Sequence, residues 1–418
     1  MSALLDTLRP PHPLTQRETS ILALFGVIAF TTGWSGSALT HALPFVQEDL
    51  GLSESGVFDL MALVRAAALM ALALSWWGDR SGRRRPLLVG FVLLTTGNLA
   101  TAMFPALGAV TVSQSIARVG TIALGGLAVV VLAEEVQPGV RAYAIGVFAL
   151  FGSVGTGFGL LLRPLADLAP DGWRLLFALS AIPILATPLL ARRLRESRAF
   201  LRPIERPPLA MVFRRGHAGR FWPMAVLAFS VAAFTGPAAN LALLRMQHDL
   251  DWSTGAASLM LAVTSAPGVT IGVLAGGRMA DVVGRRWTQF VSLAIGVSGG
   301  ILFYTSDNGW LMGVGITVST FGAFAFAPAF ASHRSELFPT DLRATASAWI
   351  VNAGIIGGLM GFTAGRFVVD SWGIPRTIGA LGIALFFVSF VVFTLPETKG
   401  VRLSTEVDPM DPADAIGA

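Results

Sequence analysis

Three ionisable side chains fall inside long apolar stretches of the chain, where a charge is costly and usually serves a function. Arg65 and Arg118 lie near the middle of two such stretches, and His41 lies toward the end of another. A buried guanidinium needs a carboxylate, backbone carbonyls or an anionic ligand. No acidic residue stands centrally in any of the stretches, so the excess positive charge favours an organic anion over a neutral sugar as ligand. A structural contact with backbone carbonyls is the alternative for Arg118, whereas for Arg65 a packing or gating role is favoured over a ligand contact.

Two further motifs occur twice, in the same order and at similar offsets. The pattern Asp-x-x-Gly-Arg-Arg is formed once by Asp79, Gly82, Arg83 and Arg84 and again by Asp281, Gly284, Arg285 and Arg286. A Glu-x-x-Pro segment that leads to an arginine contains Glu135 and Arg141 in one copy and Glu336 and Arg343 in the other. Because an aspartate at a helix end can pair with an arginine or stabilise the N-terminus of a neighbouring helix, these charges can hold helices together. Two recurring motifs indicate an internal duplication.

The repeated Asp-x-x-Gly-Arg-Arg loop resembles the signature loop of the major facilitator superfamily. The stretches 336–340 and 395–400, together with Trp173-Arg174, resemble the sugar porter and metabolite:proton symporter branch. The resemblance implies twelve transmembrane helices in two pseudo-symmetric six-helix bundles, an all-α membrane protein with its site at the interface of the repeats. It also implies that Asp79 contacts Arg141 and the region near Arg343 to latch one state, and that Asp281 mirrors this contact.

In that family the first, fourth, seventh and tenth helices surround the cavity. Polar and aromatic residues on these helices and on the eleventh are therefore expected beside Arg118, although ordinary packing is the alternative for each. The expected substrate contacts are Arg118, Trp34, His41, Phe234, Asn240, Phe326 and Asn352.

The composition agrees with a membrane protein. Of 418 residues, 54% are hydrophobic and only 13% charged, whereas soluble domains carry about 25% charged residues. Apolar runs near the spanning length of about 20 residues predict twelve spans. These are 19–45, 55–76, 86–106, 110–133, 142–165, 173–192, 221–245, 255–277, 287–305, 309–332, 344–368 and 375–395.

The arginines indicate the orientation in the plasma membrane. They concentrate in the loops after the second and eighth spans and in the linker between the halves, whereas the opposite loops are acidic or nearly neutral. The positive-inside rule then places both termini in the cytoplasm. The predicted organisation is a tail 1–18, a first half 19–192, a linker 193–220, a second half 221–397 and a tail 398–418.

The sequence also argues against other functions. It has no cysteine, its five histidines lack metal-ligand spacing, and it has no phosphate-binding Walker loop, so we expect no metal, no cofactor and no ATP-driven step. The net charge of +5 comes from loop arginines and does not indicate nucleic acid. We expect a monomeric secondary transporter of a small metabolite, coupled to protons through His41 or Glu135, with uniport or anion exchange left open. Efflux of amphipathic compounds is the first alternative, and a membrane sensor or enzyme is the less favoured one.

Overall fold

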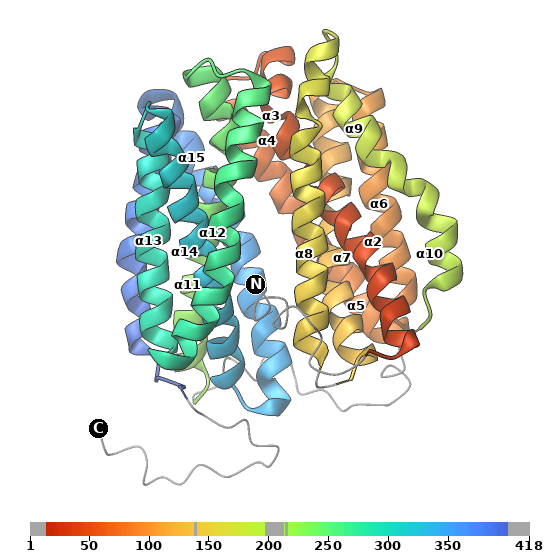
Figure 1. The fold of residues 1–418 in the computed structure, drawn as a ribbon, viewed down its shortest axis with the longest axis vertical. Helices are drawn as coiled ribbons and strands as arrows, with labels where there is room; N and C mark the ends of the chain where they lie inside the picture. Colours follow the sequence, from red (N-terminus) through yellow and green to blue (C-terminus); the bar gives the residue numbers. More distant parts are fainter. Residues whose placement is uncertain (1–13, 138–139, 197–212, 214–215, 400–418) are drawn as a thin grey trace, which may run out of the picture. The chain divides into compact units, whose positions relative to one another are not determined.

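The computed structural model describes residues 14–137, 140–196, 213 and 216–399, and the regular structure within them is helical (Figure 1). Eleven helical stretches in these residues are long and apolar enough to cross a membrane. The last of them, Thr345–Thr394, contains the eleventh and twelfth predicted spans in one continuous element. At Gly373 the backbone leaves the helical region with φ of 72°, and this kink separates the two spans. The twelve predicted spans are therefore all helical, with ends that differ from the prediction by about five residues or fewer.

Three of the spans begin at residues whose side chains accept hydrogen bonds from the first free N–H groups of the helix. Thr15 and Glu18 form a reciprocal capping box at the start of the first span, and the Ser53 hydroxyl accepts from the N–H of Gly56 at the start of the second. The Asn308 side chain accepts from two backbone N–H groups at the start of the tenth. Such caps fix helix starts that hydropathy alone leaves uncertain.

The chain divides into two compact units. Unit 1 contains residues up to Ile204 together with Thr235–Val263 and Gly358–Ile378, and unit 2 contains Glu205–Phe234, Thr264–Gly357 and the residues from Gly379 onward. The division cuts through three helices of the second half, because the ends of those helices pack with the first half. The domain boundaries expected from the sequence remain a prediction.

Unit 1 holds the six spans of the first half. Its elements are α2 (Gln16–Gly36), α3 (Ala38–Asp49), α4 (Glu54–Ala67), η1 (Ala68–Met70), α5 (Ala71–Ser81), α6 (Arg84–Met103), α7 (Leu107–Glu135), α8 (Arg141–Leu161), η3 (Arg163–Leu168), α9 (Trp173–Ala181), η4 (Ile182–Ala186) and α10 (Thr187–Arg193). It also takes in parts of α11 (Ala218–Leu244), α12 (Thr254–Val282) and α15 (Thr340–Ser389), and the π-helical turn η7 (Arg245–Asp249).

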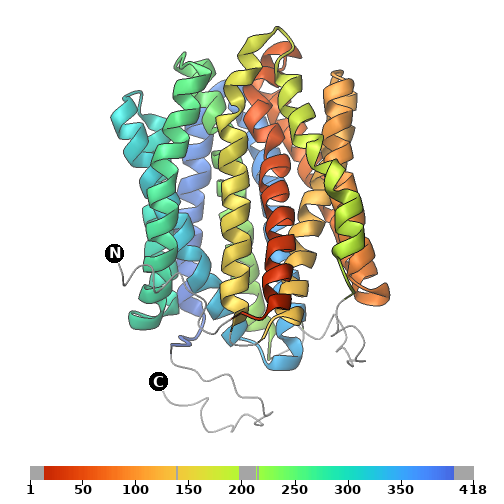
Figure 2. The same cartoon turned by 45° about the vertical axis from the view of Figure 1, so that its right-hand side comes forward.

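Close helix packing in unit 1 depends on small residues. Helices α2 and α8 run side by side (Figure 2). A Cβ atom at Gly33 or Gly155 would overlap backbone of the facing helix, so only glycine permits this approach. Apolar side chains such as Phe25, Phe91 and Leu124 form the buried core beside this contact.

Unit 2 is built around α13 (Arg285–Thr305) and α14 (Gly309–Glu336), which pack along their length through glycines. It also contains η8 (Phe390–Thr394) and the remaining parts of α11, α12 and α15. A Cβ at Gly299 would stand 2.4 Å from the backbone nitrogen of Ser319 and one at Gly315 would stand 2.7 Å from that of Phe303, so these two helices also approach closely. A buried cluster that includes Phe221, Phe338 and Leu395 closes one end of the unit.

Candidate functional site

A pocket inside unit 1 has a lining that differs from its apolar surroundings. About 370 Å³ of space, open solvent included, lies between side chains from α2, α3, α4, α7 and α11. The lining residues are Ser35, Gly36, Leu39, Thr40, Met61, Val64, Arg65, Gln114, Ala117, Arg118, Thr121 and Asn240. The set combines an apolar wall with hydroxyl, amide and guanidinium groups and holds no carboxylate, a composition typical of a small-ligand site with positive charge.

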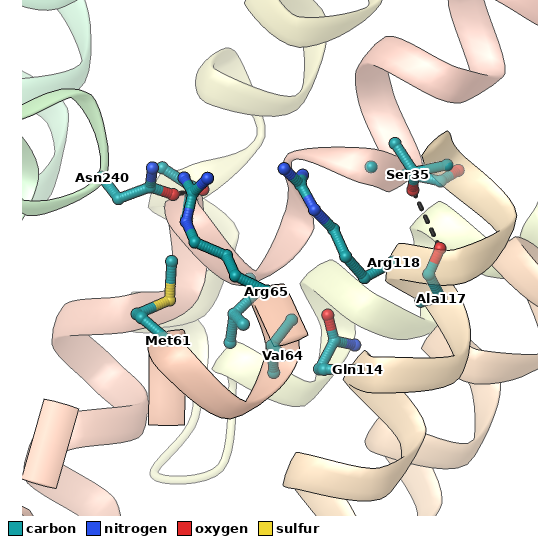
Figure 3. A pocket seen from close by; sticks show the side chains of 12 residues that line it. Ser35, Met61, Val64, Arg65, Gln114, Ala117, Arg118 and Asn240 are labelled. Atoms are coloured by element: carbon teal, nitrogen blue, oxygen red, sulfur yellow. Dashed lines mark hydrogen bonds between the residues drawn. The ribbon is translucent and has the colours of Figure 1, made fainter. Parts of the chain in front are cut away.

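Two arginines from neighbouring helices supply that charge. Figure 3 shows the guanidinium groups of Arg65 in α4 and Arg118 in α7 turned toward the same space. In both residues Nε is buried without a hydrogen-bond partner, and within the described part of the chain neither guanidinium pairs with a carboxylate. Arg65 instead lies over the ring of Phe362, with Cζ 5.0 Å from the ring centre. Two like charges in a low-dielectric pocket repel each other and attract an anion.

The other polar side chains of the pocket are largely engaged with one another. The Thr40 hydroxyl donates to Oδ1 of Asn240, and Nδ2 of Asn240 donates to the carbonyl of Gly236 at 2.7 Å. The Thr121 hydroxyl donates to the carbonyl of Ala117 at 2.9 Å. The guanidinium groups of Arg65 and Arg118 are the charged donors of the site.

Of the substrate contacts expected from the sequence, the pocket brings together Arg118 and Asn240. Trp34 instead packs edge-on against Phe158, with ring centres 4.9 Å apart. His41 is buried, and its ring lies with Trp34 against Gly159 of α8. Neither lines the pocket.

Three expected contacts lie in unit 2. Phe234 is buried against Gly300 and Gly382. Phe326 stacks on Phe330 with ring centres 5.0 Å apart. Asn352 is half-buried on α15. Their roles as substrate contacts remain predictions.

Among the lining residues that the sequence does not predict as ligand contacts, Arg65 and Gln114 matter most to the chemistry of the pocket. The sequence favours packing or gating for Arg65 and makes no prediction for Gln114. The sequence does contain a signal for Gln114, because it precedes Arg118 by four residues and therefore shares its helix face.

The first signature loop forms a charged cluster at the end of unit 1 where α5 stops. Gly82 has φ of 99°, a conformation that side chains with a Cβ adopt at a cost. The Glu196 carboxylate fills the space that a Cβ would occupy there and accepts from the backbone N–H of Arg83 at 2.6 Å. Arg83 in turn donates to Glu134 at 2.9 Å, and the Arg84 side chain donates to the carbonyl of Leu194 at 2.8 Å.

Unit 2 repeats this arrangement with its own residues. Gly284 has φ of 115°, and a Cβ there would stand 2.7 Å from Oε2 of Glu397. The Glu397 carboxylate accepts from the N–H groups of Arg285 at 2.8 Å and Arg286 at 3.0 Å. Arg285 donates to Glu336 at 2.9 Å, as Arg83 does to Glu134.

The separation of 51 residues between arginine and glutamate is the same in both loops. This spacing makes Glu134, rather than the expected Glu135, the structural counterpart of Glu336. Glu135 pairs with Arg17 instead. The sequence motifs suggested Glu135 because a one-residue difference before Arg141 shifts the register.

Only some side chains of the expected latch between the loops and the neighbouring helices are among the residues that the structure describes. The side chains of Asp79 and Arg141 lie outside the described residues. Asp281 pairs with Arg285 at 2.6 Å, inside its own loop, and Nε of Arg343 is buried without a hydrogen-bond partner. The latch stays a prediction.

Glu397 lies beyond the spanning segments and is an acid whose ionisation stabilises its loop. Burial alone would raise the pKa of the Glu397 carboxyl, but hydrogen bonds from the backbone of Arg285, Arg286, Lys399 and Thr398 outweigh it and lower the pKa. Backbone N–H groups at a helix start favour the charged carboxylate in this way.

At the opposite end of unit 1, helices of the first half are bonded to segments of the second half. The fully buried Arg163 donates to the carbonyl of His41 at 2.7 Å, to the hydroxyl of Ser258 at 2.9 Å and to the side chain of Gln247. Asp59 pairs with Arg366 at 2.8 Å. These bonds hold this end of the unit together.

Comparison with known proteins decides the family. The model of the Major Facilitator Superfamily matches residues 25–244 and 221–413, which is most of the chain. The chain belongs to the Major Facilitator Superfamily. Its long apolar helices fit a multi-pass membrane protein, and its relatives over most of the chain are named as transporters rather than enzymes.

Relatives within the superfamily include two bacterial proteins aligned over most of both chains. The probable 4-methylmuconolactone transporter of Cupriavidus pinatubonensis is 25% identical over 89% of this chain and 89% of its own. The gallate transporter of Pseudomonas putida is 26% identical over 91% and 92%. The myo-inositol transporter 3C of Cryptococcus neoformans is 30% identical over 42% of this chain, and the chain spans only 31% of its length.

Solved structures of the superfamily share the fold. A bacterial homolog of the human lysosomal transporter Spinster has a TM-score of 0.75 with 16% identity, over 91% of this chain and 97% of that one. The xylose transporter XylE from E. coli has a TM-score of 0.70 with 19% identity, over 92% and 98%. These likenesses show the shared fold, and the family match confirms the expected membership of the superfamily.

Proposed function

We propose that this protein is a secondary active transporter of a small organic anion. The observation that carries the proposal is the pair Arg65 and Arg118, which line one pocket and, within the described residues, have no carboxylate partner. Two buried guanidinium groups without counter-charge are costly unless a ligand supplies it. A carboxylate between them forms charge-assisted hydrogen bonds that a neutral sugar does not offer.

The relatives that align over most of the chain support this choice. Their names assign them gallate and 4-methylmuconolactone, whereas the myo-inositol transporter matches over less than half of this chain. The longer alignments therefore favour an organic acid over a neutral polyol.

The transport cycle that we propose is alternating access in the plasma membrane, with both termini and the two signature loops in the cytoplasm. Arg163, Asp59 and their partners hold the end of unit 1 opposite its signature loop. In this orientation that end faces the exterior, and its bonds break when the pocket opens outward.

We further propose that protons drive uptake. The described lining of the pocket contains no titratable acid, so the proton binds elsewhere or travels with the anion. His41 is the favoured carrier, because it is buried, directly follows the pocket residue Thr40 and bonds through its carbonyl to Arg163. Glu135 is less suited, because it is engaged with Arg17.

The test is uptake by purified protein in liposomes with an imposed pH gradient. Labelled gallate and benzoate are the anionic probes, and labelled xylose and myo-inositol are the neutral ones. We expect uptake of an anion that falls at least about tenfold in Arg118→Ala and in Arg65→Ala, since each loses a charge-assisted bond. Arg80→Ala serves as the matched control, because Arg80 is exposed and stacks on Trp76 outside the pocket. Uptake of a neutral probe alone, or full anion uptake by both pocket variants, would refute the proposal.

Efflux of amphipathic compounds is the second candidate. A multidrug resistance protein, Stp of Mycobacterium tuberculosis, is 29% identical over 140 residues, which is 32% of this chain. Drug resistance that depends on the chain, without anion uptake in liposomes, would select this candidate.

A further inference from the structure

We propose that Gln114 makes the pocket selective for hydroxycarboxylates, anions that carry a hydroxyl donor near the carboxylate. The inference rests on the proposed function, because it assumes that Arg65 and Arg118 hold an organic anion. It adds a second requirement on that anion. The reason is the direction in which a buried polar network turns the Gln114 amide.

The network starts at a group that can only accept. The backbone carbonyl of Ser35 has no proton, so the Asn98 amide must present its NH2 group, and Nδ2 of Asn98 donates to this carbonyl at 2.9 Å. Oδ1 of Asn98 is then turned the other way, toward Gln114. Asn98 is fully buried, so solvent water does not offer its amide other hydrogen bonds that would let it turn over.

Gln114 must complement that oxygen. Its Nε2 donates to Oδ1 of Asn98 at 3.1 Å and to the hydroxyl of Thr101 at 2.7 Å. Thr101 can accept because its own proton goes to the carbonyl of Gly97 at 3.0 Å or to Ser113. Both protons of the Gln114 amide are thus used on the side away from the pocket.

The amide oxygen of Gln114 is what remains for the pocket. Gln114 is one of the lining residues, and within the described chain no group donates to its Oε1. Figure 3 shows this oxygen on the side of Arg118, which follows Gln114 by one helical turn. The Thr40 hydroxyl donates to Asn240, the Thr121 hydroxyl to the carbonyl of Ala117, and the Asn240 amide to the carbonyl of Gly236. None of them donates to Oε1.

A ligand therefore meets two positive donors and one neutral acceptor in neighbouring positions. The carboxylate of the ligand pairs with the guanidinium groups, and Oε1 of Gln114 needs a donor from the same ligand. A hydroxyl supplies it. A second ionised carboxylate does not, because it would place like partial charges against each other, and an unsubstituted hydrocarbon leaves a desolvated acceptor without a partner.

The experiment measures selectivity rather than affinity alone. Dissociation constants are determined by calorimetry for benzoate against its 2-, 3- and 4-hydroxy derivatives, and for propionate against lactate. In the wild type we expect the best hydroxylated acid of a series to bind about tenfold more tightly than its parent acid. In Gln114→Met, which keeps the size and removes the acceptor, the ratio falls to about one, mainly through weaker binding of the hydroxy acid.

Two further variants separate recognition from folding. Thr95→Val removes a buried hydroxyl of the same helix as Asn98 whose bonds, among the residues that the structure describes, go to the carbonyls of Phe91 and Val92, so the ratio should stay at its wild-type value. If Gln114→Met does not fold, Gln114→Leu takes its place. The expected ratio of dissociation constants between parent and hydroxylated acid is again about one.

The outcomes distinguish this inference from the proposed function. The proposed role of Gln114 is refuted, and the anion site stands, in either of two cases. In the first, acids bind the wild type but a hydroxyl does not change the dissociation constant. In the second, Gln114→Met keeps the wild-type ratio of dissociation constants between parent and hydroxylated acid. If no acid binds the wild type at all, the proposed function itself has failed.

Discussion

Gly82 and Gly284 are the residues on which the two signature loops depend most directly. Each has a positive φ, and at each the carboxylate of a distant glutamate takes the place of a side chain. The glycine is therefore required twice over, for its backbone conformation and for the space beside it.

We predict that Gly82→Ala and Gly284→Ala each destabilise the protein. The strained backbone costs about 1–3 kcal/mol, and displacement of Glu196 or Glu397 from the helix start adds to it. Thermal unfolding in detergent measures the effect as a lower Tm. Gly108→Ala is the control, because a Cβ there meets nothing within 4 Å and alanine suits the start of a helix. Equal Tm values for all three variants would argue against the assigned role.

Glu397 gives this region a pH dependence with a defined sign. Its folded-state pKa is lowered relative to 4.5, the value of an unperturbed glutamate. The stabilisation by its charge is therefore fully present above about pH 4.5 and is lost as the pH falls through the lower folded-state pKa. We predict that Glu397→Gln lowers Tm at pH 7. The difference in Tm between this variant and the wild type should become smaller as the pH drops below about 4.5. A gap that widens in acid would show that the shift has the opposite sign.

At the scale of elements, Arg163 is the clearest support of the closed end of unit 1. It lies in the short η3 turn and bonds to α3, η7 and α12 at once. Its partners are neutral, so the guanidinium acts through the geometry of its donors rather than through an ion pair. A lysine cannot reproduce three divergent bonds from one planar group.

We predict that Arg163→Ala and Arg163→Lys open this end more often. Each lost bond leaves a buried acceptor unsatisfied, at about 1–3 kcal/mol each. Because the chain contains no cysteine, the single substitution Thr40→Cys reports access to the pocket without background labelling. The thiol introduced at this position should react with a membrane-impermeant maleimide faster in the Arg163 variants than in the parent. Unchanged rates would mean that Arg163 does not hold the end closed.

The sequence predicts elements better than it predicts contacts. Hydropathy located the twelve spans because length and apolar composition are local properties. It did not identify Glu134 or Glu196 as partners of Arg83, since those contacts arise only when helices far apart in sequence meet. It identified Arg118 from its burial, yet missed Gln114, whose amide is directed by Asn98 on another helix.

At the scale of the whole molecule, the positive-inside rule makes a prediction of its own. Both termini and both signature loops should lie on the cytoplasmic side. In the cysteine-free chain, the single variants Ser2→Cys and Ser404→Cys should react with an impermeant maleimide only after cells are permeabilised, whereas Ser306→Cys should react in intact cells. The reverse pattern would invert the orientation.

The most direct test of the account is whether the pocket recognises negative charge. A panel of small carboxylic acids that includes gallate is titrated against the purified protein, each acid beside its own methyl ester. The account predicts that at least one acid binds, that its neutral ester binds at least about tenfold more weakly, and that the double variant Arg65→Gln/Arg118→Gln no longer separates the two. An ester that binds as tightly as its acid, or a double variant that still prefers the acid, would contradict it.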